Sequence, residues 1–216
     1  MKKILSVVIA MIIGALSVPF TAFAAENGFK VYESVIVVSA DASATDTYAA
    51  QRLKHYLDKI TGKNIEIVNG NTDSAEYEIC IGGTNKAESD SADGSYTITS
   101  TAKKIIICGA GNKGTINGVH AFLEKYCGCH WYETQVIVVP ENENLTVPAD
   151  INIEYTPFFE YTETDTASSR DIEFSLANGL TGGVYRDFAA EHGAAVEYLG
   201  RFCHTFTTFF CKSETY

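Results

Sequence analysis

The sequence predicts an α+β fold in which a mainly antiparallel sheet carries two helices on one face. Three observations favour it. Short runs of β-branched and apolar residues recur over residues 31–147, only two segments there have helical apolar spacing, and several strand segments follow one another without a helix between them. Strict alternation of strands and helices would instead indicate a parallel sheet, so the pattern is typical of an α+β layer.

The two helices are predicted from their spacing and their ends. Residues 47–60 place apolar side chains on one helical stripe, and Gly62 is suited to a left-handed C-cap. Residues 115–127 form a second stripe that includes His120, which is therefore predicted to lie in the core, whereas His55 is predicted to be solvated. Strands are predicted at residues 31–38, 64–68, 77–81, 95–100, 103–109, 135–140 and 144–147.

A glycine motif joins the strand at 103–109 to the second helix. Gly109, Gly111 and Gly114 fit the G-x-G-x-x-G pattern of dinucleotide sites, and Glu133 follows about twenty residues later. That pattern belongs to a parallel βαβ crossover, whereas residues 95–109 are predicted to form an antiparallel hairpin. We therefore interpret the glycines as a tight turn, with Asn112 as a candidate helix N-cap, and predict no cofactor.

The N-terminus has the pattern of a bacterial secretory signal peptide. Lys2 and Lys3 precede an apolar run over residues 4–20, and the small residues Ala22 and Ala24 surround a predicted cleavage point after residue 24. The alternative is a retained anchor helix, because the run is close to the ~18 residues that span a bilayer. We expect a secreted or cell-surface protein with no membrane contact after cleavage.

Charge and cysteine content exclude several classes of partner. The net charge of −11 disfavours nucleic acid and anionic lipid, both of which require clustered cations. The six cysteines allow fifteen disulfide pairings, so the connectivity stays open. Cys127, Cys129 and His130 suggest a zinc site, but the usual C-x₂₋₄-C spacing and a second ligand pair are missing, and no metal is predicted.

Residues 103–133 also carry a family resemblance. Their order of strand, glycine turn, helix and Gly-Cys-His-Trp-Tyr exit resembles the end of the small domain that precedes the catalytic barrel in alpha-glucuronidases of glycoside hydrolase family 67. The second domain of beta-N-acetylhexosaminidases of family 20 and a group of secreted bacterial proteins are similar there too. His130 stands where these families commonly have arginine.

The resemblance implies a domain organisation. Residues 25–150 would be an accessory α+β domain, and residues 151–216 the incomplete start of a (β/α)₈ barrel, which needs at least ~200 residues. In the resembling enzymes, the barrel domain covers the face of the sheet that the helices leave open. We therefore expect the segment after residue 150 to begin that cover.

The resemblance also implies a function. The chain would be the N-terminal fragment of a secreted glycoside-hydrolase-like protein that acts on extracellular polysaccharide or glycan, with the missing barrel domain as its intramolecular partner. Hydrolysis requires two carboxyl groups that flank the scissile bond, and the resembling enzymes take theirs from later barrel strands, so the fragment itself is expected to be inactive. The alternative is a non-catalytic carbohydrate-binding or adhesion module.

Three residues are candidates for contact with carbohydrate, and no catalytic residue is assigned. His204 falls where a second barrel strand would end, the position that binding groups occupy in such barrels, and Arg201 is its nearest cationic neighbour in sequence. A structural histidine is the alternative for His204. Trp131, the only tryptophan, is a candidate stacking platform or, in the interpretation we favour, a buried residue at the seam between the small domain and the barrel.

Overall fold

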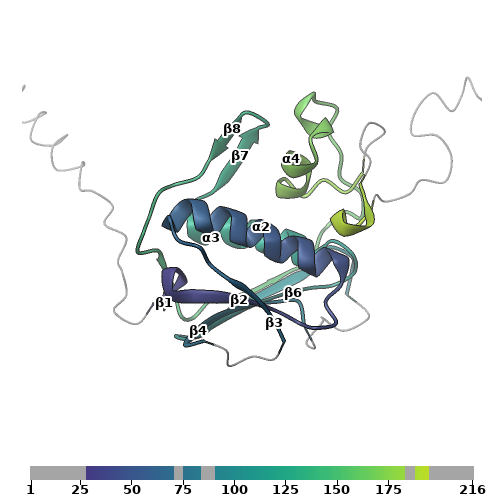
Figure 1. Ribbon diagram of the computed structural model, residues 1–216. Coiled ribbons are helices and arrows are strands. Elements are labelled where there is room, and N and C mark those ends of the chain that lie inside the picture. Colours follow the sequence, from purple (N-terminus) through teal and green to yellow (C-terminus); the bar gives the residue numbers. More distant parts are fainter. Residues whose placement is uncertain (1–27, 71–74, 84–90, 183–187, 195–216) are drawn as a thin grey trace, which may run out of the picture.

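The computed structural model describes residues 28–70, 75–83, 91–182 and 188–194 (Figure 1). The predicted signal peptide over residues 1–24 and the candidates Arg201 and His204 lie outside these residues. Within the described ranges, no helix combines the length and apolar character needed to cross a bilayer.

A six-stranded mixed sheet forms the base of the molecule (Figure 1). Its order is β10-β5-β6-β4-β2-β3. Strands β2, β3, β4 and β6 run parallel to one another, while β5 is antiparallel to β6 and β10 is antiparallel to β5. The bounds are β2 Ser34–Val38, β3 Ile67–Asn69, β4 Tyr77–Ile81, β5 Tyr96–Ser100, β6 Lys104–Gly109 and β10 Asn152–Tyr155.

The α+β class is confirmed, and four of the seven strand pairings in the described chain are antiparallel. The six-stranded sheet adds what the sequence did not predict, since three of its five pairings are parallel. The parallel part is centred on strand β2, which has a parallel neighbour on each side and is mostly buried, as strands of parallel sheets usually are. The predicted hairpin between β5 and β6 is confirmed.

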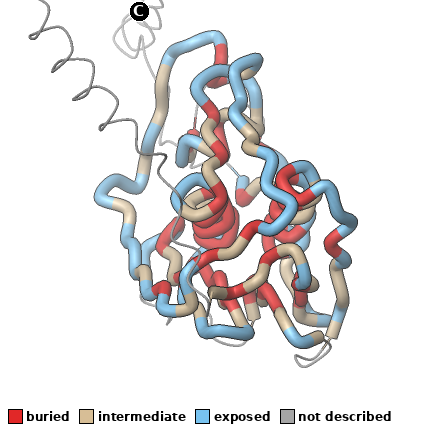
Figure 2. The backbone as a smooth tube through the Cα atoms, turned by 90° about the vertical axis from the view of Figure 1, so that its left-hand side faces the viewer, coloured by how far each residue is buried: buried red, intermediate tan, exposed pale blue. Residues whose placement is uncertain are grey.

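Both helices lie side by side on one face of this sheet, as predicted (Figure 1). Helix α2 spans Ala44–Thr61 and begins with a capping box, in which the side chain of Ser43 accepts from the Asp46 backbone amide. Helix α3 spans Gly114–Cys127. Gly62 ends α2 in the left-handed conformation at φ 68°, which confirms the predicted C-cap. Figure 2 shows the buried residues gathered along these helices and the sheet beneath them.

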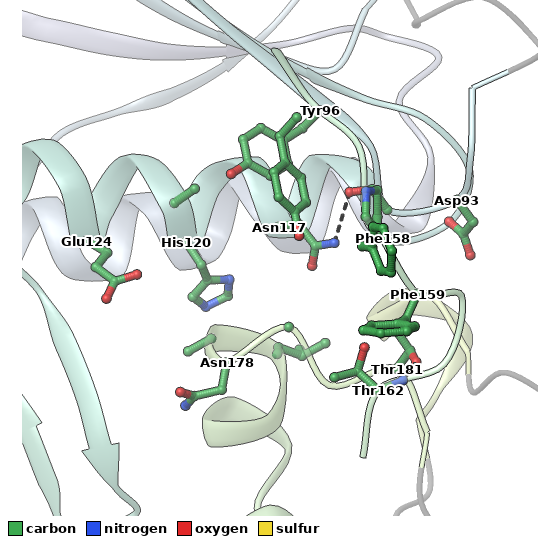
Figure 3. Close-up of a pocket in the computed structure, with 17 residues that line it drawn as sticks. Asp93, Tyr96, Asn117, His120, Glu124, Phe158, Phe159, Thr162, Asn178 and Thr181 are labelled. Atoms are coloured by element: carbon green, nitrogen blue, oxygen red, sulfur yellow. Dashed lines mark hydrogen bonds between the residues drawn. The ribbon is translucent and has the colours of Figure 1, made fainter. Parts of the chain in front are cut away.

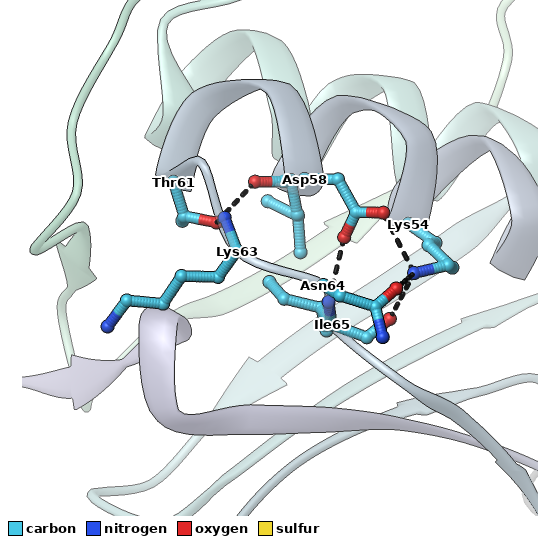
Figure 4. Close-up of polar contacts among 7 residues, drawn as sticks. Lys54, Asp58, Thr61, Lys63, Asn64 and Ile65 are labelled. Atoms are coloured by element: carbon cyan, nitrogen blue, oxygen red, sulfur yellow. Dashed lines mark hydrogen bonds and ion pairs between the residues drawn. The ribbon is translucent and has the colours of Figure 1, made fainter.

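A polar cluster fixes the connection from α2 to β3 (Figure 4). The Lys54 ammonium donates to the Asp58 carboxylate at 2.8 Å, to the Asn64 side-chain oxygen at 2.7 Å and to the Ile65 carbonyl at 2.8 Å. The other Asp58 oxygen accepts from the Ile65 amide at 2.8 Å. Because these bonds hold the chain as it leaves the helix, they orient the parallel return into β3.

Two short ribbons complete the described strands. β1 (Phe29–Lys30), which a 3₁₀ turn at Val31–Glu33 separates from β2, pairs with β9 (Thr146–Val147). β7 (His130–Glu133) pairs with β8 (Val136–Val138), and this ribbon projects beyond the helices (Figure 1).

The chain beyond β10 packs on the helices and not on the open face of the sheet (Figure 1). Helix α4 (Ile172–Ala177) contacts α3, and the 3₁₀ turn η3 (Ala190–His192) contacts α2; a further turn, η2, spans Ser168–Arg170. Our expectation that this segment would begin to cover the open sheet face is therefore wrong for its described part. The reason lies in α2, whose outer side offers Arg52 and Tyr56 as partners for Glu173 of α4.

Candidate ligand-binding pocket

A cavity of about 400 Å³ opens between α3, the adjoining ends of β5 and β10, and residues 157–181 (Figure 3). Its size lies within the range of ~300–1,000 Å³ that is typical of small-molecule sites. It is lined by Asp93, Gly94, Tyr96, Asn117, His120, Ala121, Glu124, Tyr155, Pro157, Phe158, Phe159, Thr162, Leu176, Ala177, Asn178, Gly179 and Thr181.

His120 is a buried lining residue with an unused nitrogen. Its Nδ1 lies 3.0 Å from the Ile116 carbonyl oxygen, which can only accept, so Nδ1 carries the proton and Nε2 is a bare acceptor. Nε2 is buried and has no hydrogen-bond partner. Burial lowers the pKa of His120 to about 4, so the ring is neutral at neutral pH. The predicted burial of His120 is confirmed, but the sequence did not predict its place in a pocket.

Three further side chains that line the cavity carry oxygen acceptors. The Asn117 amide donates to the Gly94 carbonyl at 3.1 Å, and the Asn178 amide donates to the carbonyls of Trp131 and Phe174 at 3.2 and 2.9 Å. The side-chain oxygens of both asparagines remain as acceptors. The Glu124 carboxylate, 3.5 Å from His130 Nδ1, adds a third.

Aromatic rings form the outer wall. Tyr96 and Tyr155 stack with their ring centroids 4.9 Å apart, and Phe158 meets Phe159 edge to face at 4.8 Å. Phe158 is 89% exposed and Phe159 65% exposed. Because the two rings are adjacent, they form a continuous exposed apolar patch, and such patches typically mark contact sites. In Figure 3 these two rings stand beside the cavity, while His120 and Asn117 project from α3 toward the loop that carries Asn178.

The glycine turn before α3 is structural. A Cβ at Gly109 would lie 1.9 Å from the Gly114 backbone, and Gly111 has φ 64°, so both positions require glycine. The Asp93 carboxylate accepts from the amides of Asn112 and Lys113 at 2.7 and 3.1 Å, which places an anion where a phosphate would bind. The N-cap of α3 is Lys113 and has no side-chain cap bond, so the predicted Asn112 cap is wrong.

Trp131 lies at the seam between the helices and the segment that follows the sheet. It is 6% exposed, and its Nε1 donates to the Tyr56 hydroxyl at 2.9 Å. Its ring meets Tyr56 and His120 at centroid distances of 5.1 and 5.2 Å. This environment fits the seam interpretation and leaves little of the ring open to a sugar.

The cysteines near the end of α3 are poor metal ligands. Cys127 and Cys129 are buried and not in disulfides. Burial raises the pKa of Cys129 to about 12 and raises that of Cys127 well above its usual value, so the thiolate that zinc requires is disfavoured. Over the described residues, no group of three or more His, Cys, Asp or Glu side chains is placed to hold a metal ion.

Comparison with known proteins identifies a related domain. Residues 19–125 match the family model for glycosyl hydrolase family 20, domain 2. Among solved structures, the chain is similar to the Streptomyces plicatus N-acetyl-beta-hexosaminidase in complex with Thio-NAglucal, at 13% identity and a TM-score of 0.42, over 61% of this chain and 24% of that one. It is also similar to a GH138 enzyme targeting pectin rhamnogalacturonan II, at 19% identity and a TM-score of 0.32, over 43% of this chain and 10% of that one.

No curated protein matches the chain. The chain spans about a quarter of the hexosaminidase and a tenth of the GH138 enzyme.

Proposed function

Because residues 19–125 carry a domain like domain 2 of the family 20 glycosyl hydrolases, we propose that this chain is the N-terminal, accessory part of a secreted glycoside-hydrolase-like protein that acts on extracellular glycan. The family match is the observation that carries the proposal. The acidic sequence is compatible with it, since a net charge of −11 suits a carbohydrate partner better than nucleic acid.

The accessory role is supported by the way the chain continues after the domain. Glu173 of α4 accepts hydrogen bonds from Arg52, at 3.2 Å, and from the Tyr56 hydroxyl, and both donors belong to α2. The helix layer therefore serves as a platform for the segment that follows. In the proposed protein, this platform carries the start of a (β/α)₈ barrel.

In this proposal, the chain alone does not hydrolyse glycans. Hydrolysis requires a pair of carboxyl groups on either side of the scissile bond. Of the two carboxylates that line the described pocket, Asp93 is held by backbone amides of the glycine turn, which leaves Glu124 without an equivalent partner there. The acid pair would come from barrel strands encoded further along the gene.

A direct test compares two proteins. The 216-residue chain and the product of any open reading frame that continues beyond the Tyr216 codon are each incubated with 4-nitrophenyl glycosides of neutral, N-acetylated and uronic sugars. We expect release of nitrophenol by the longer protein only. Hydrolysis by the 216-residue chain, or inactivity of a longer protein toward every glycoside and polysaccharide tried, would refute the proposal.

The alternative is a carbohydrate-binding or adhesion module without catalysis. The exposed rings of Phe158 and Phe159 beside a pocket favour it, since binding modules present such surfaces. Glycan binding by an intact protein that has no hydrolytic activity would support this alternative.

A further inference from the structure

We propose that the pocket between α3 and residues 157–181 binds a single neutral sugar ring, which packs against Phe158 and Phe159 and donates hydroxyl hydrogen bonds to His120 Nε2 and the Asn178 side-chain oxygen. The preference for a sugar over other donor-rich molecules rests on the proposed function. The site itself rests on the pocket residues.

The strongest indication is the unpartnered nitrogen of His120. A buried acceptor without a partner costs free energy, and native proteins rarely leave one without a reason. This nitrogen belongs to a residue that lines the cavity. A ligand that donates a hydrogen bond would satisfy it.

The remaining polar groups specify the same kind of ligand. The side-chain oxygens of Asn117 and Asn178 keep free lone pairs because their nitrogens already donate to backbone carbonyls. Glu124 adds carboxylate oxygens. A ligand for this set must offer several donors, as the hydroxyl groups of a pyranose do.

The charges of the lining residues restrict the class of ligand further. No lysine or arginine is among the described residues that line the cavity, whereas Asp93 and Glu124 are. Uronic acids and phosphates would therefore meet acceptors and negative charge with no cation to balance them. A quaternary ammonium ion is the competing ligand, because aromatic rings and carboxylates also attract cations.

The aromatic wall supplies the apolar contact. Phe158 and Phe159 have open ring surface, and Tyr96 and Tyr155 stack at the end of the sheet nearby. The C–H face of a pyranose can cover such a ring while its hydroxyl groups reach the acceptors on α3 and the Asn178 loop. One ring is a weak ligand, and the usual free energy per atom corresponds to a Kd of about 1 mM for a methyl hexopyranoside.

The test titrates the full chain with methyl β-D-glucopyranoside, methyl β-D-galactopyranoside and methyl α-D-mannopyranoside. Glucuronic acid and choline serve as counter-probes, and binding is followed by saturation-transfer NMR and by shifts of protein amide signals. We expect at least one neutral glycoside to bind with a Kd near 1 mM, and neither counter-probe to bind as tightly.

Two variants locate the site, and a third is the control. Phe158→Ala removes an exposed ring, so folding should be unaffected while the Kd rises about fivefold. His120→Leu removes the unused acceptor, and the Kd should rise about tenfold without loss of stability at neutral pH. Tyr132→Ala removes a ring of 65% exposure that is outside the cavity lining, and should leave the Kd unchanged.

Three outcomes would overturn the proposal. They are the absence of binding by every neutral glycoside, tighter binding of choline or glucuronic acid, and equal effects of Phe158→Ala and Tyr132→Ala on affinity. Unfolding of His120→Leu would leave the Phe158→Ala comparison decisive. Nitrophenyl glycoside hydrolysis by a longer gene product does not depend on this pocket, so failure here and failure of the proposed function are separable.

Discussion

Replacement of Trp131 by alanine should destabilise the fold strongly. The side chain is 6% exposed, packs against Tyr56 and His120, and donates a hydrogen bond to the Tyr56 hydroxyl. Truncation of a buried tryptophan to alanine leaves a cavity, and such changes cost ~3–5 kcal/mol. Trp131→Phe keeps a ring and loses the Nε1–H donor, so it should cost about 1–2 kcal/mol.

The neighbouring residue is a matched control. Tyr132 follows Trp131 in β7 and is 65% exposed, because successive side chains of a strand point to opposite faces. Tyr132→Ala should change the free energy of unfolding by less than about 0.5 kcal/mol. Urea unfolding of all variants is followed by far-ultraviolet circular dichroism, because Trp131 is the only tryptophan and its fluorescence is lost in Trp131→Ala and Trp131→Phe.

The outcome separates the two interpretations of Trp131. A loss of several kcal/mol in Trp131→Ala, with sugar affinity kept in Trp131→Phe, fits a residue at the seam. If Trp131→Ala costs less than about 1 kcal/mol and abolishes sugar binding, the residue is a ligand platform and our reasoning is wrong.

Three further predictions concern the turn, the helix cap and pH. Gly109→Ala should lower the free energy of unfolding in urea by about 3 kcal/mol, because the new Cβ would lie 1.9 Å from backbone atoms. At Gly62 a Cβ would have no atom within 4 Å, so Gly62→Ala should cost only the ~1 kcal/mol that its positive φ imposes on alanine. Equal costs for the two variants would refute the steric argument. Ser43→Ala removes the capping box and should cost ~1 kcal/mol, and an unchanged urea midpoint would contradict the cap. The pKa of His120 is lowered from 6.5 to about 4, so between these two pH values the histidine is protonated in the unfolded chain but not in the native one. As the pH falls from 6.5 to 4, the free energy of unfolding should therefore decrease by roughly 3 kcal/mol relative to that of His120→Leu. A difference between the two proteins that does not vary with pH would contradict this.

Local signals account for the parts of the fold that sequence reasoning predicted well. The strand at residues 77–81 has the predicted bounds, and both helices agree within a few residues of each end. Glycine at a left-handed C-cap is an effect of a single residue, so it can be seen without tertiary structure, whereas the one N-cap that we predict, Asn112, is wrong. The hairpin of β5 and β6 is likewise a contact between neighbours in sequence.

Strand order could not be predicted because it depends on distant contacts. β4 lies between β2 and β6, and the sequence of residues 77–81 does not indicate which strands will pair with it. β10 extends the sheet to Tyr155, past the expected domain boundary at residue 150, because its residues pair with β5 some fifty positions earlier. Pairing between strands so far apart in the chain leaves no periodic pattern in the sequence.

The pocket was missed for the same reason. His120 has the helical spacing of a core residue, and its burial agrees with that interpretation. The fact that it also faces a cavity follows only from the position of residues 157–181, which follow the edge strand β10 and return to α3. The one available signal was the run Pro157-Phe158-Phe159, whose aromatic rings lie beside polar residues; it falls within residues 151–216, which we predict to be the start of a barrel.

The most direct test of our central claim, that the helix layer holds the segment after the domain, is a double-mutant cycle between Arg52 and Glu173. Their side chains are 21% and 30% exposed and meet at 3.2 Å across the seam between α2 and α4. We predict a coupling free energy of about 1 kcal/mol in Arg52→Ala, Glu173→Ala and the double variant. The control pair Lys103 and Glu76, at 70% and 65% exposure, should couple by close to zero. A coupling at Arg52 and Glu173 no larger than that of the control would contradict the docking of this segment on the helices.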